Sequence, residues 1–338
     1  MDSVDRRDFM KSVAGAAALA AAPGGAEVAA AVSAQPSGAP ERPAAADAIF
    51  LTTWAFGLAA NERAAAVFAA SGNLLDAVEK GINVVEDDPA ITSVGYGGLP
   101  NADGVVELDA GIMDGSRHRA VAICNLHQIK NPISVARQAL ERTRETTYAG
   151  HGAFLMALKF GFQPQQLLTP ESLRKWQEWR ANPDRKTFWV SRENHDTIGM
   201  LATDGRGHLV SGCSTSGMAF KIPGRVADSP LVGCGIYADD SAGAATATGD
   251  GDLMTNYCTS VVIVQMMARG ASPQEACEEL LRWMVRTDPR NRGSASAVIA
   301  MDTRGRVGAA CMNPQFQLQY AIWQGGRGEV REGRAIYS

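Results

Sequence analysis

The sequence predicts an α+β fold built from antiparallel sheet layers that are covered by helices. Two observations lead to this prediction: helix-like apolar patterns come in clusters, and strand-length apolar runs come in pairs joined by tight turns. A tight turn makes its two strands antiparallel neighbours, which argues against a doubly wound parallel sheet. The sequence shows no period of about 20 to 50 residues, so it does not indicate a repeat array.

The helical segments have recognisable starts and ends. Residues 61–88 contain two helical patterns that are separated by the Ser-Gly pair at 71–72. An Asn-Pro pair at 131–132 opens a further helix, because a cap residue followed by proline at the first helical position is a typical start. The Ser-Pro-Gln-Glu run at 272–275 has the form of a capping box and precedes a helical pattern at 276–286.

Two hairpins are expected in the second half of the chain. Residues 197–214 form two apolar runs joined across an Asp-Gly turn at 204–205. Residues 294–312 repeat this arrangement, with an Arg-Gly pair near the turn. The segment 161–194 mixes proline, charged residues and tryptophan, and it is the one region predicted to be irregular. No loose polar linker divides residues 47–338, so we expect a single domain there.

The first 46 residues differ in kind from the rest. Paired Arg6 and Arg7, followed by Phe9 and a short alanine-rich run, resemble a twin-arginine export signal, and an Ala-, Gly- and Pro-rich tether follows. The run is short and weakly apolar for a membrane span, so an anchor helix is the less favoured alternative. We therefore expect an exported protein, periplasmic or secreted, that does not contact the membrane once the signal is removed.

Composition and charge exclude several classes of protein. Of the 338 residues 46% are hydrophobic, which suits a packed core, and a formal net charge of -4 without a long basic run argues against nucleic-acid binding. The six cysteines contain no Cys-x-x-Cys pair, and the five histidines lack the helical spacing of a zinc site, so we expect no metal. Disulfides remain open, although single buried thiols are the commoner state of scattered cysteines.

Several familiar motifs are approached but not matched. The run at 212–216 resembles a nucleophile elbow but has serine in place of the second glycine. The glycine-rich segments at 96–104 and 248–252 match neither a phosphate loop nor a dinucleotide fingerprint. The acidic residues from 239 onward depart from the spacing of a calcium loop, so we interpret Asp239 and Asp240 as a surface turn.

The run Glu-Asn-His-Asp-Thr-Ile-Gly-Met at 193–200 places His195, Asp196 and Thr197 in succession. Neighbouring side chains of an extended chain point to opposite faces, so these three cannot easily converge as a catalytic triad. A threonine hydroxyl becomes a nucleophile when a base lies beside it, and a terminal amine, with a pKa of about 7.7 to 8.0, is such a base. Thr197 acquires that amine if the bond between Asp196 and Thr197 is cut.

The residues around this bond suit a self-cleavage. If Thr197 Oγ attacks the carbonyl of Asp196, the peptide converts to an ester, which water then opens. Asp196 is placed to take a proton and His195 to orient or polarise the bond. An irregular segment before the cut would let the new amine move free. The sequence therefore predicts an N-terminal threonine nucleophile.

The chain resembles the glycosylasparaginases, which are N-terminal nucleophile hydrolases, over roughly residues 52–308. The segment HDTIGM is typical of this branch, whereas plant-type asparaginases and isoaspartyl peptidases usually have Gly-Thr-Val-Gly there. The matching stretches, in the right order, are TTWAF, LDAVEKG, SVGYGGLPN, GIMDGS, IKNPISVAR, HDTIGM, STSG, GRVADSP, GCGIYADDSAGAATATGDGD and GAAC.

The resemblance implies a four-layer αββα sandwich, with two antiparallel sheets between helix layers. It implies a precursor that cuts itself into an α chain ending at residue 196 and a β chain of residues 197–338. The implied reaction is hydrolysis of the amide bond of N4-(β-N-acetylglucosaminyl)-L-asparagine through a β-aspartyl ester, without metal or organic cofactor. A homodimer of αβ units is expected from the resemblance alone.

The resemblance also assigns roles to particular residues. Arginine suits a carboxylate because its planar guanidinium binds both oxygens, and aspartate suits an ammonium. The implied roles are Thr197 as nucleophile, His195 and Asp196 with Thr197 in autoproteolysis, Thr215 as hydrogen-bond partner of the nucleophile, Arg225 and Asp228 for the α-carboxylate and α-ammonium of the substrate, Thr248 and Gly249 as the oxyanion hole, Gly251 on the same turn, and Trp54 as a pocket wall.

The sequence departs from familiar members of the family in several places. TTWAF lacks the proline often found after the tryptophan, RVAD has alanine where glycine is common, and the segment before the cut is short. The cysteines do not match the disulfide set of the animal enzymes. Two alternatives stay open: an isoaspartyl peptidase or L-asparaginase with the same machinery, and, more distantly, a secreted binding protein that never matures.

Overall fold

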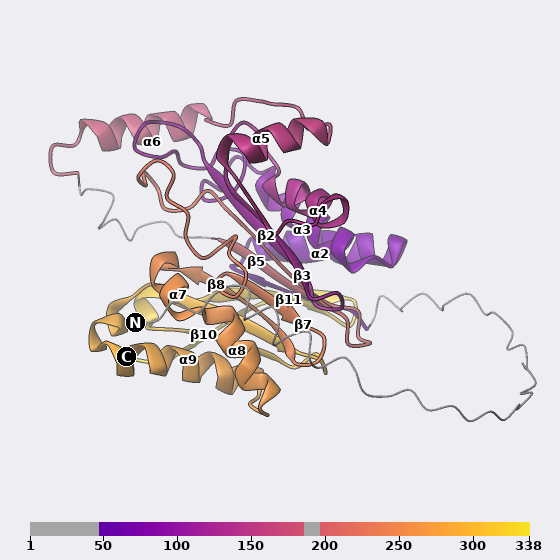
Figure 1. Cartoon of the computed structure of the whole chain (residues 1–338). Helices are drawn as coiled ribbons and strands as arrows, with labels where there is room; N and C mark the ends of the chain where they lie inside the picture. Colours follow the sequence, from indigo (N-terminus) through magenta and orange to yellow (C-terminus); the bar gives the residue numbers. More distant parts are fainter. Residues whose placement is uncertain (1–46, 186–196) are drawn as a thin grey trace, which may run out of the picture. The chain divides into compact units, whose positions relative to one another are not determined.

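Two β-sheets lie face to face in the described part of the chain, and helices cover the outer side of each sheet (Figure 1). The computed structural model describes residues 47–185 and 197–338, which all belong to one unit. The predicted export signal and tether lie outside the described residues, and so do His195 and Asp196. Across the described ranges, no helix combines the length and apolar character needed to cross a membrane.

The larger sheet has eight strands among the described residues. Its pairs are antiparallel except at one edge, where β3 and β4 run parallel. The strands, in spatial order, are β12 (Arg327–Glu332), β11 (Gln319–Gln324), β1 (Ile49–Thr53), β5 (Ile198–Thr203), β6 (Leu209–Thr215), β2 (Leu108–Asp114), β3 (Arg119–Leu126) and β4 (Thr147–Ala149).

The smaller sheet has five strands in the same described ranges and is antiparallel except between β13 and β10. The strands, in spatial order, are β13 (Arg334–Ala335), β10 (Val307–Cys311), β9 (Ser296–Asp302), β8 (Gly243–Gly249) and β7 (Ile236–Asp239). Both predicted hairpins are confirmed, as β5 with β6 and β9 with β10. Gly205 and Gly305 both adopt φ +75° at these turns, a conformation that glycine reaches without strain.

The helices fall into groups according to the sheet they cover. Two short 3-10 turns, Pro289–Gly293 and Pro314–Phe316, complete the elements. The larger sheet is covered by α2 (Gly57–Ser71), α3 (Leu74–Glu86), α4 (Pro132–Arg142) and α5 (Gly150–Lys159) (Figure 1). The smaller sheet is covered by α8 (Thr259–Ala268) and α9 (Pro273–Thr287). Helix α6 (Pro170–Ala181) packs against the loops that contain Ala102 and Phe220, and the short α7 (Gly251–Tyr257) follows β8.

Three apolar clusters fill the spaces between these four layers. Successive residues of a strand point to opposite faces, so Phe50 of β1 packs under the helices while Leu51 packs between the sheets. On the other sheet, Ile299 of β9 faces the inter-sheet core and Val298 faces α8 and α9. The αββα sandwich is thus confirmed, because both sheets bury both of their faces.

The predicted helix starts are confirmed, with one difference in mechanism. Ser272 and Glu275 form the complete capping box of α9. The helix that begins at Pro132 lacks a side-chain cap, because the Asn131 amide instead donates to Glu86 Oε2 at 3.1 Å and to Asp87 Oδ1 at 2.8 Å. Asn131 therefore joins α4 to the end of α3 rather than capping its own helix.

The prediction that residues 161–194 are irregular was wrong for their middle part, where α6 forms. Thr169 caps the helix by accepting from the Ser172 amide at 3.3 Å. Ser172 is the one buried residue of this helix, and none of its apolar side chains is buried, so the helix lacks the buried apolar stripe by which hydrophobic periodicity reveals a helix. Two tryptophans attach it to the rest of the protein: Trp176 Nε1 donates to the Ala102 carbonyl at 3.2 Å, and Trp179 stacks on Phe220 with centroids 4.8 Å apart.

Candidate active site

Thr197 stands immediately before β5, in the centre of the larger sheet, and is 7% exposed. Its carbonyl oxygen accepts from Thr53 Oγ1 at 2.7 Å, and the same Thr53 oxygen accepts from the Gly199 amide at 2.9 Å. The two sheets approach closely here, since a Cβ added to Gly199 would lie 2.4 Å from Thr246 Oγ1 of β8. The fold therefore fixes the backbone of Thr197 beside the smaller sheet.

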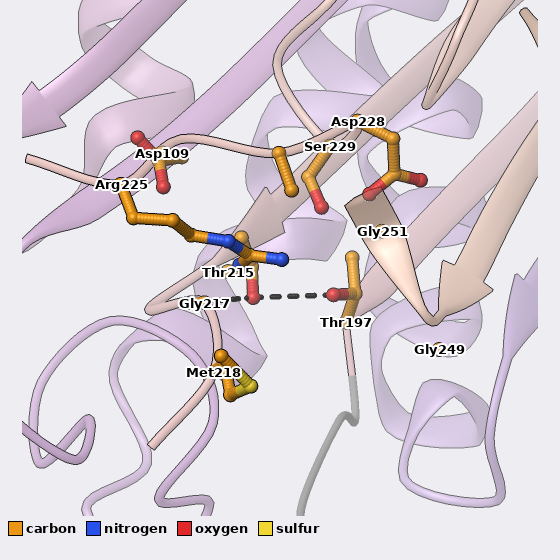
Figure 2. Close-up of a pocket in the computed structure, with 11 residues that line it drawn as sticks. Asp109, Thr197, Thr215, Gly217, Met218, Arg225, Asp228, Ser229, Gly249 and Gly251 are labelled. Atoms are coloured by element: carbon orange, nitrogen blue, oxygen red, sulfur yellow. Dashed lines mark hydrogen bonds between the residues drawn. The ribbon is translucent and has the colours of Figure 1, made fainter. Parts of the chain in front are cut away.

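The hydroxyl of Thr197 donates to Thr215 Oγ1 at 3.1 Å, which is the contact drawn in Figure 2. Thr215 ends β6, the neighbour of β5, so antiparallel pairing brings the two threonines together. Thr215 Oγ1 donates its own proton to the Ser93 carbonyl at 3.3 Å and also accepts from the Gly217 amide at 2.9 Å. These bonds orient Thr215 to accept from Thr197.

Thr248 and Trp54 meet on the other side of Thr197. Thr248 Oγ1 donates to the Thr197 carbonyl at 3.4 Å and accepts from Trp54 Nε1 at 3.1 Å. Trp54 itself has φ +64°, which is uncommon for a bulky residue, and its ring packs edge-on against Phe316 with centroids 5.2 Å apart. Trp54 therefore fixes the position of the Thr248 hydroxyl oxygen.

Gly249 and Gly251 are glycines because of what surrounds them. Gly249 has φ +106°, and an added Cβ would lie 1.8 Å from the Ala295 carbonyl oxygen. An added Cβ at Gly251 would lie 2.4 Å from Asp228 Oδ1. Because Gly251, the first residue of α7, has no side chain, the Asp228 carboxylate can occupy the space beside it.

Asp228 is a buried carboxylate, 4% exposed, and its Oδ2 has no hydrogen-bond partner among the described residues. Burial raises its pKa from 3.8 to about 7, while the nearby Arg225 guanidinium acts in the opposite direction. An unpaired buried carboxylate costs free energy, so such a group in a pocket indicates a cationic ligand.

Arg225 lies beside Asp228 and is 18% exposed. Its Nη2 donates to Asp252 Oδ2 at 2.8 Å, and its Nε is buried without a partner in the described part of the chain. Figure 2 shows both side chains reaching toward the space around the Thr197 hydroxyl. The site thus presents an anionic and a cationic group next to the nucleophile.

Six of the predicted residues line one pocket, while Trp54 and Thr248 support it from the side through their hydrogen bonds. His195 and Asp196 lie outside the described residues. In the ranges 47–185 and 197–338, no group of three or more His, Cys, Asp and Glu side chains is arranged to hold a metal ion. The six are Thr197, Thr215, Arg225, Asp228, Gly249 and Gly251.

The sequence reasoning missed several residues that line the same pocket. Asp109, 1% exposed, lies on β2 within a matched part of the chain, but its strand position gave no sign that it faces the site. Ser229 follows Asp228 directly and could have been proposed on that ground. The others are Gly217, Met218 and Ala227.

A threonine at the start of a central strand, hydrogen-bonded to a second threonine in a sandwich of two mainly antiparallel sheets and their helix layers, defines the class of the N-terminal nucleophile hydrolases. The family model described as asparaginase matches residues 51–327, which is most of the chain. The protein belongs to this asparaginase family.

Named relatives agree with the family and with the predicted resemblance to glycosylasparaginases. The chain is 44% identical over 286 residues to the N(4)-(beta-N-acetylglucosaminyl)-L-asparaginase of Elizabethkingia miricola, covering 83% of this chain and 84% of that one. It is 37% identical over 292 residues to the protein of the same name from Rattus norvegicus, covering 78% and 84% of the two chains. The predicted family is therefore confirmed.

Proposed function

We propose that the protein hydrolyses the amide bond between N-acetylglucosamine and the side chain of asparagine, with Thr197 as its nucleophile. One observation carries the proposal: the Thr197 hydroxyl, 3.1 Å from Thr215 Oγ1, shares a pocket with the unpartnered Asp228 carboxylate oxygen and the Arg225 guanidinium. The names of the two relatives favour this substrate over other amides.

The first chemical step uses the free amine that Thr197 has after cleavage. This amine takes the hydroxyl proton while Oγ attacks the amide carbonyl of the substrate. The amine then gives the proton to the departing amino sugar, and a β-aspartyl ester forms on Thr197. Water, activated by the same amine, hydrolyses this ester and releases aspartate. Thr215 holds the nucleophile in place through its hydrogen bond.

The negative charge that develops on the carbonyl oxygen requires donors. Thr248 and Gly249 are the last two residues of β8 and lie next to Thr197. Because Trp54 Nε1 donates to the Thr248 hydroxyl oxygen, the hydroxyl proton of Thr248 stays directed toward Thr197. Donors that are fixed before the reaction stabilise the transition state without reorganisation. We assign Thr248 and Gly249 to the oxyanion hole.

We expect Gly249→Ala to lower kcat by about 100-fold or more, because a Cβ 1.8 Å from the Ala295 oxygen must displace this end of β8. Gly270→Ala is the matched control: Gly270 has nearly the same φ, +103°, but nothing lies within 4 Å of its added Cβ. That control should lose about 1 kcal/mol of stability and keep its activity. Equal losses of activity in the two variants would contradict the role of Gly249.

Arg225 and Asp228 account for the recognition of the asparagine part of the substrate. The guanidinium matches the α-carboxylate, and the buried carboxylate, lacking a partner among the described residues, matches the α-ammonium. A substrate without either group would leave a buried charge unpaired, which is strongly disfavoured. The protein should therefore act on glycosylasparagine whose peptide neighbours have already been removed.

The maturation step involves residues outside the described ranges. We propose cleavage of the bond between Asp196 and Thr197, because an amine on Thr197 is required for the chemistry above. Residues up to 196 then form the α chain and residues 197–338 the β chain. We also propose export through the twin-arginine segment that contains Arg6 and Arg7.

Steady-state kinetics on three compounds test the proposed substrate. We expect kcat/KM to be highest for glucosaminyl-asparagine, lower for a β-aspartyl dipeptide and lowest for free asparagine, since all three present the same α-groups to Arg225 and Asp228 but differ in the leaving amine. A preference for the dipeptide or for asparagine would support the alternative of an isoaspartyl peptidase or L-asparaginase. A fully cleaved protein that is inactive on all three would refute the proposal.

A further inference from the structure

A cluster of three buried charges borders the pocket, which its member Asp109 lines, and has no part in the steps described above. Lys221 is 1% exposed, and its Nζ lies 3.4 Å from Asp109 Oδ2 and 3.7 Å from Glu107 Oε2. Both carboxylates are as deeply buried as the lysine. Burying three charges costs free energy unless they are paired and hydrogen-bonded, so the bonds of each member are informative.

The two carboxylates are fixed by backbone and amide donors. Asp109 Oδ1 accepts from the Asn125 amide at 2.7 Å, and Asn125 itself has the uncommon φ of +51°. Glu107 accepts from Asn101 Nδ2 at 2.8 Å and from the Gly224 amide at 3.0 and 3.1 Å. The Gly224 contact matters most for the site, because the next residue along the chain is Arg225.

Residues 217–225 are held to this cluster near both of their ends, and we call them the anion-binding segment. At its start, Gly217 has φ +74°, and an added Cβ would lie 2.9 Å from Lys221 Nζ, so the ammonium packs directly under the Gly217 backbone. The Gly217 amide also donates to Thr215 Oγ1, which accepts from the nucleophile. At its end, Glu107 holds Gly224.

The position of Arg225 therefore depends on Lys221 indirectly, through Glu107 and the Gly224 amide. Lys221 offsets the negative charge of Glu107 and Asp109. Burial raises the pKa of Glu107, but the neighbouring His127 ring, then the Lys221 ammonium and the hydrogen bonds from Asn101 and Gly224, hold it below its ordinary value. Without the ammonium, two carboxylates would remain buried close to one another, and like charges in such surroundings repel or take up protons. Glu107 would then lose its hold on the Gly224 amide.

We infer that Lys221 is a positioning residue that holds the anion-binding segment on Glu107 and Asp109 and so keeps the Arg225 guanidinium in place to bind the α-carboxylate of the substrate. This inference rests on the proposed function for the identity of the ligand. It makes Lys221 a determinant of specificity, because its effect should reach only those substrates that carry a free α-carboxylate.

The test compares Lys221→Met with the unmodified mature protein on two substrates, glucosaminyl-asparagine and the same compound with its α-carboxylate converted to an amide. We expect KM for the first to rise about tenfold or more with kcat changed less than about threefold, and KM for the second to stay unchanged. In an Arg225→Gln background, Lys221→Met should add nothing, since the effect acts through Arg225.

Three further measurements complete the test. Lys80→Met is the matched control, because Lys80 pairs with Glu79 at 2.8 Å on the surface, 45% exposed, and its loss should leave both KM values unchanged. If Lys221→Met alone folds poorly, Lys221→Met with Glu107→Gln removes the excess buried charge and allows the same kinetics. Amide hydrogen exchange should show protection lost in residues 217–225 and retained in the strands.

Two outcomes overturn the inference: KM values unchanged with protection retained, or a KM that rises equally for both substrates. Unmodified protein that turns over neither substrate speaks instead against the proposed function. Hydrogen exchange then decides the inference alone, since lost protection in residues 217–225 of the Lys221→Met variant supports it and retained protection overturns it.

Discussion

Thr197→Ala is expected to leave the precursor as one chain and to lower turnover of glucosaminyl-asparagine on the order of a millionfold. The variant lacks the hydroxyl that attacks the preceding carbonyl, so neither cleavage nor the free amine arises. A denaturing gel separates the outcomes, because the unmodified protein should give two bands and the variant a single band near 35.7 kDa, less any signal removed. Initial rates on the purified proteins measure the loss of turnover.

Two companion variants sharpen this result. Thr287→Ala makes the same chemical change at an exposed position on α9 and should mature and react normally. Thr197→Ser keeps a hydroxyl and should retain slow cleavage and measurable activity. Cleavage that persists in Thr197→Ala would refute the role of Thr197. An unmodified protein that stays uncut would favour the more distant alternative, a secreted binding protein that never matures.

Local patterns in the sequence were enough to predict the elements around the nucleophile. Alternating apolar residues joined by an Asp-Gly turn specify the β5 and β6 hairpin, and the register of that hairpin brings Thr215 beside Thr197. The capping box at Ser272 predicted the start of α9 for the same kind of reason. Such features are encoded by neighbours in the chain, so a single sequence reveals them.

Features that depend on distant partners could not be predicted in this way. Helix α6 buries none of its apolar residues completely and is attached by the half-buried Trp176 and Trp179 to loops far away in sequence. The buried cluster around Lys221 joins residues 112 positions apart, and no pattern in the sequence connects a loop lysine with Glu107 and Asp109, which lie just before and on β2. The roles of Arg225 and Asp228 came from the resemblance to a family, since a buried carboxylate and a surface one look the same in sequence.

Asp228→Asn is expected to lower kcat/KM by about 100-fold or more and, at the same time, to stabilise the ligand-free protein. The loss of activity follows because an amide cannot neutralise the α-ammonium of the substrate in a buried site. In the unmodified protein, kcat/KM should fall as the pH drops below about 7, since protonation of Asp228 removes the same ion pair. The variant should lack this part of the pH dependence and keep the part due to the Thr197 amine.

The gain in stability follows from the direction of the pKa shift. Asp228 has a pKa of about 7 in the folded protein against its ordinary value of 3.8, so the native state holds the proton more tightly than the unfolded state between these values. The contribution of Asp228 to the free energy of unfolding therefore decreases as the pH rises from about 4 to about 7, by roughly 4 kcal/mol in total. Asparagine carries no charge and avoids this cost.

Denaturant unfolding of the two proteins at a series of pH values measures the difference. Asp228→Asn should be the more stable protein at pH 8, and the advantage should shrink as the pH falls and disappear only below the ordinary pKa of 3.8, where Asp228 is protonated in both states. Asp103→Asn, at an exposed aspartate, should show no such trend. A variant that is inactive but less stable at pH 8 would mean that the carboxylate has a partner within the protein. A stabilised, inactive variant would show that Asp228 is kept charged for the ligand at the expense of the fold.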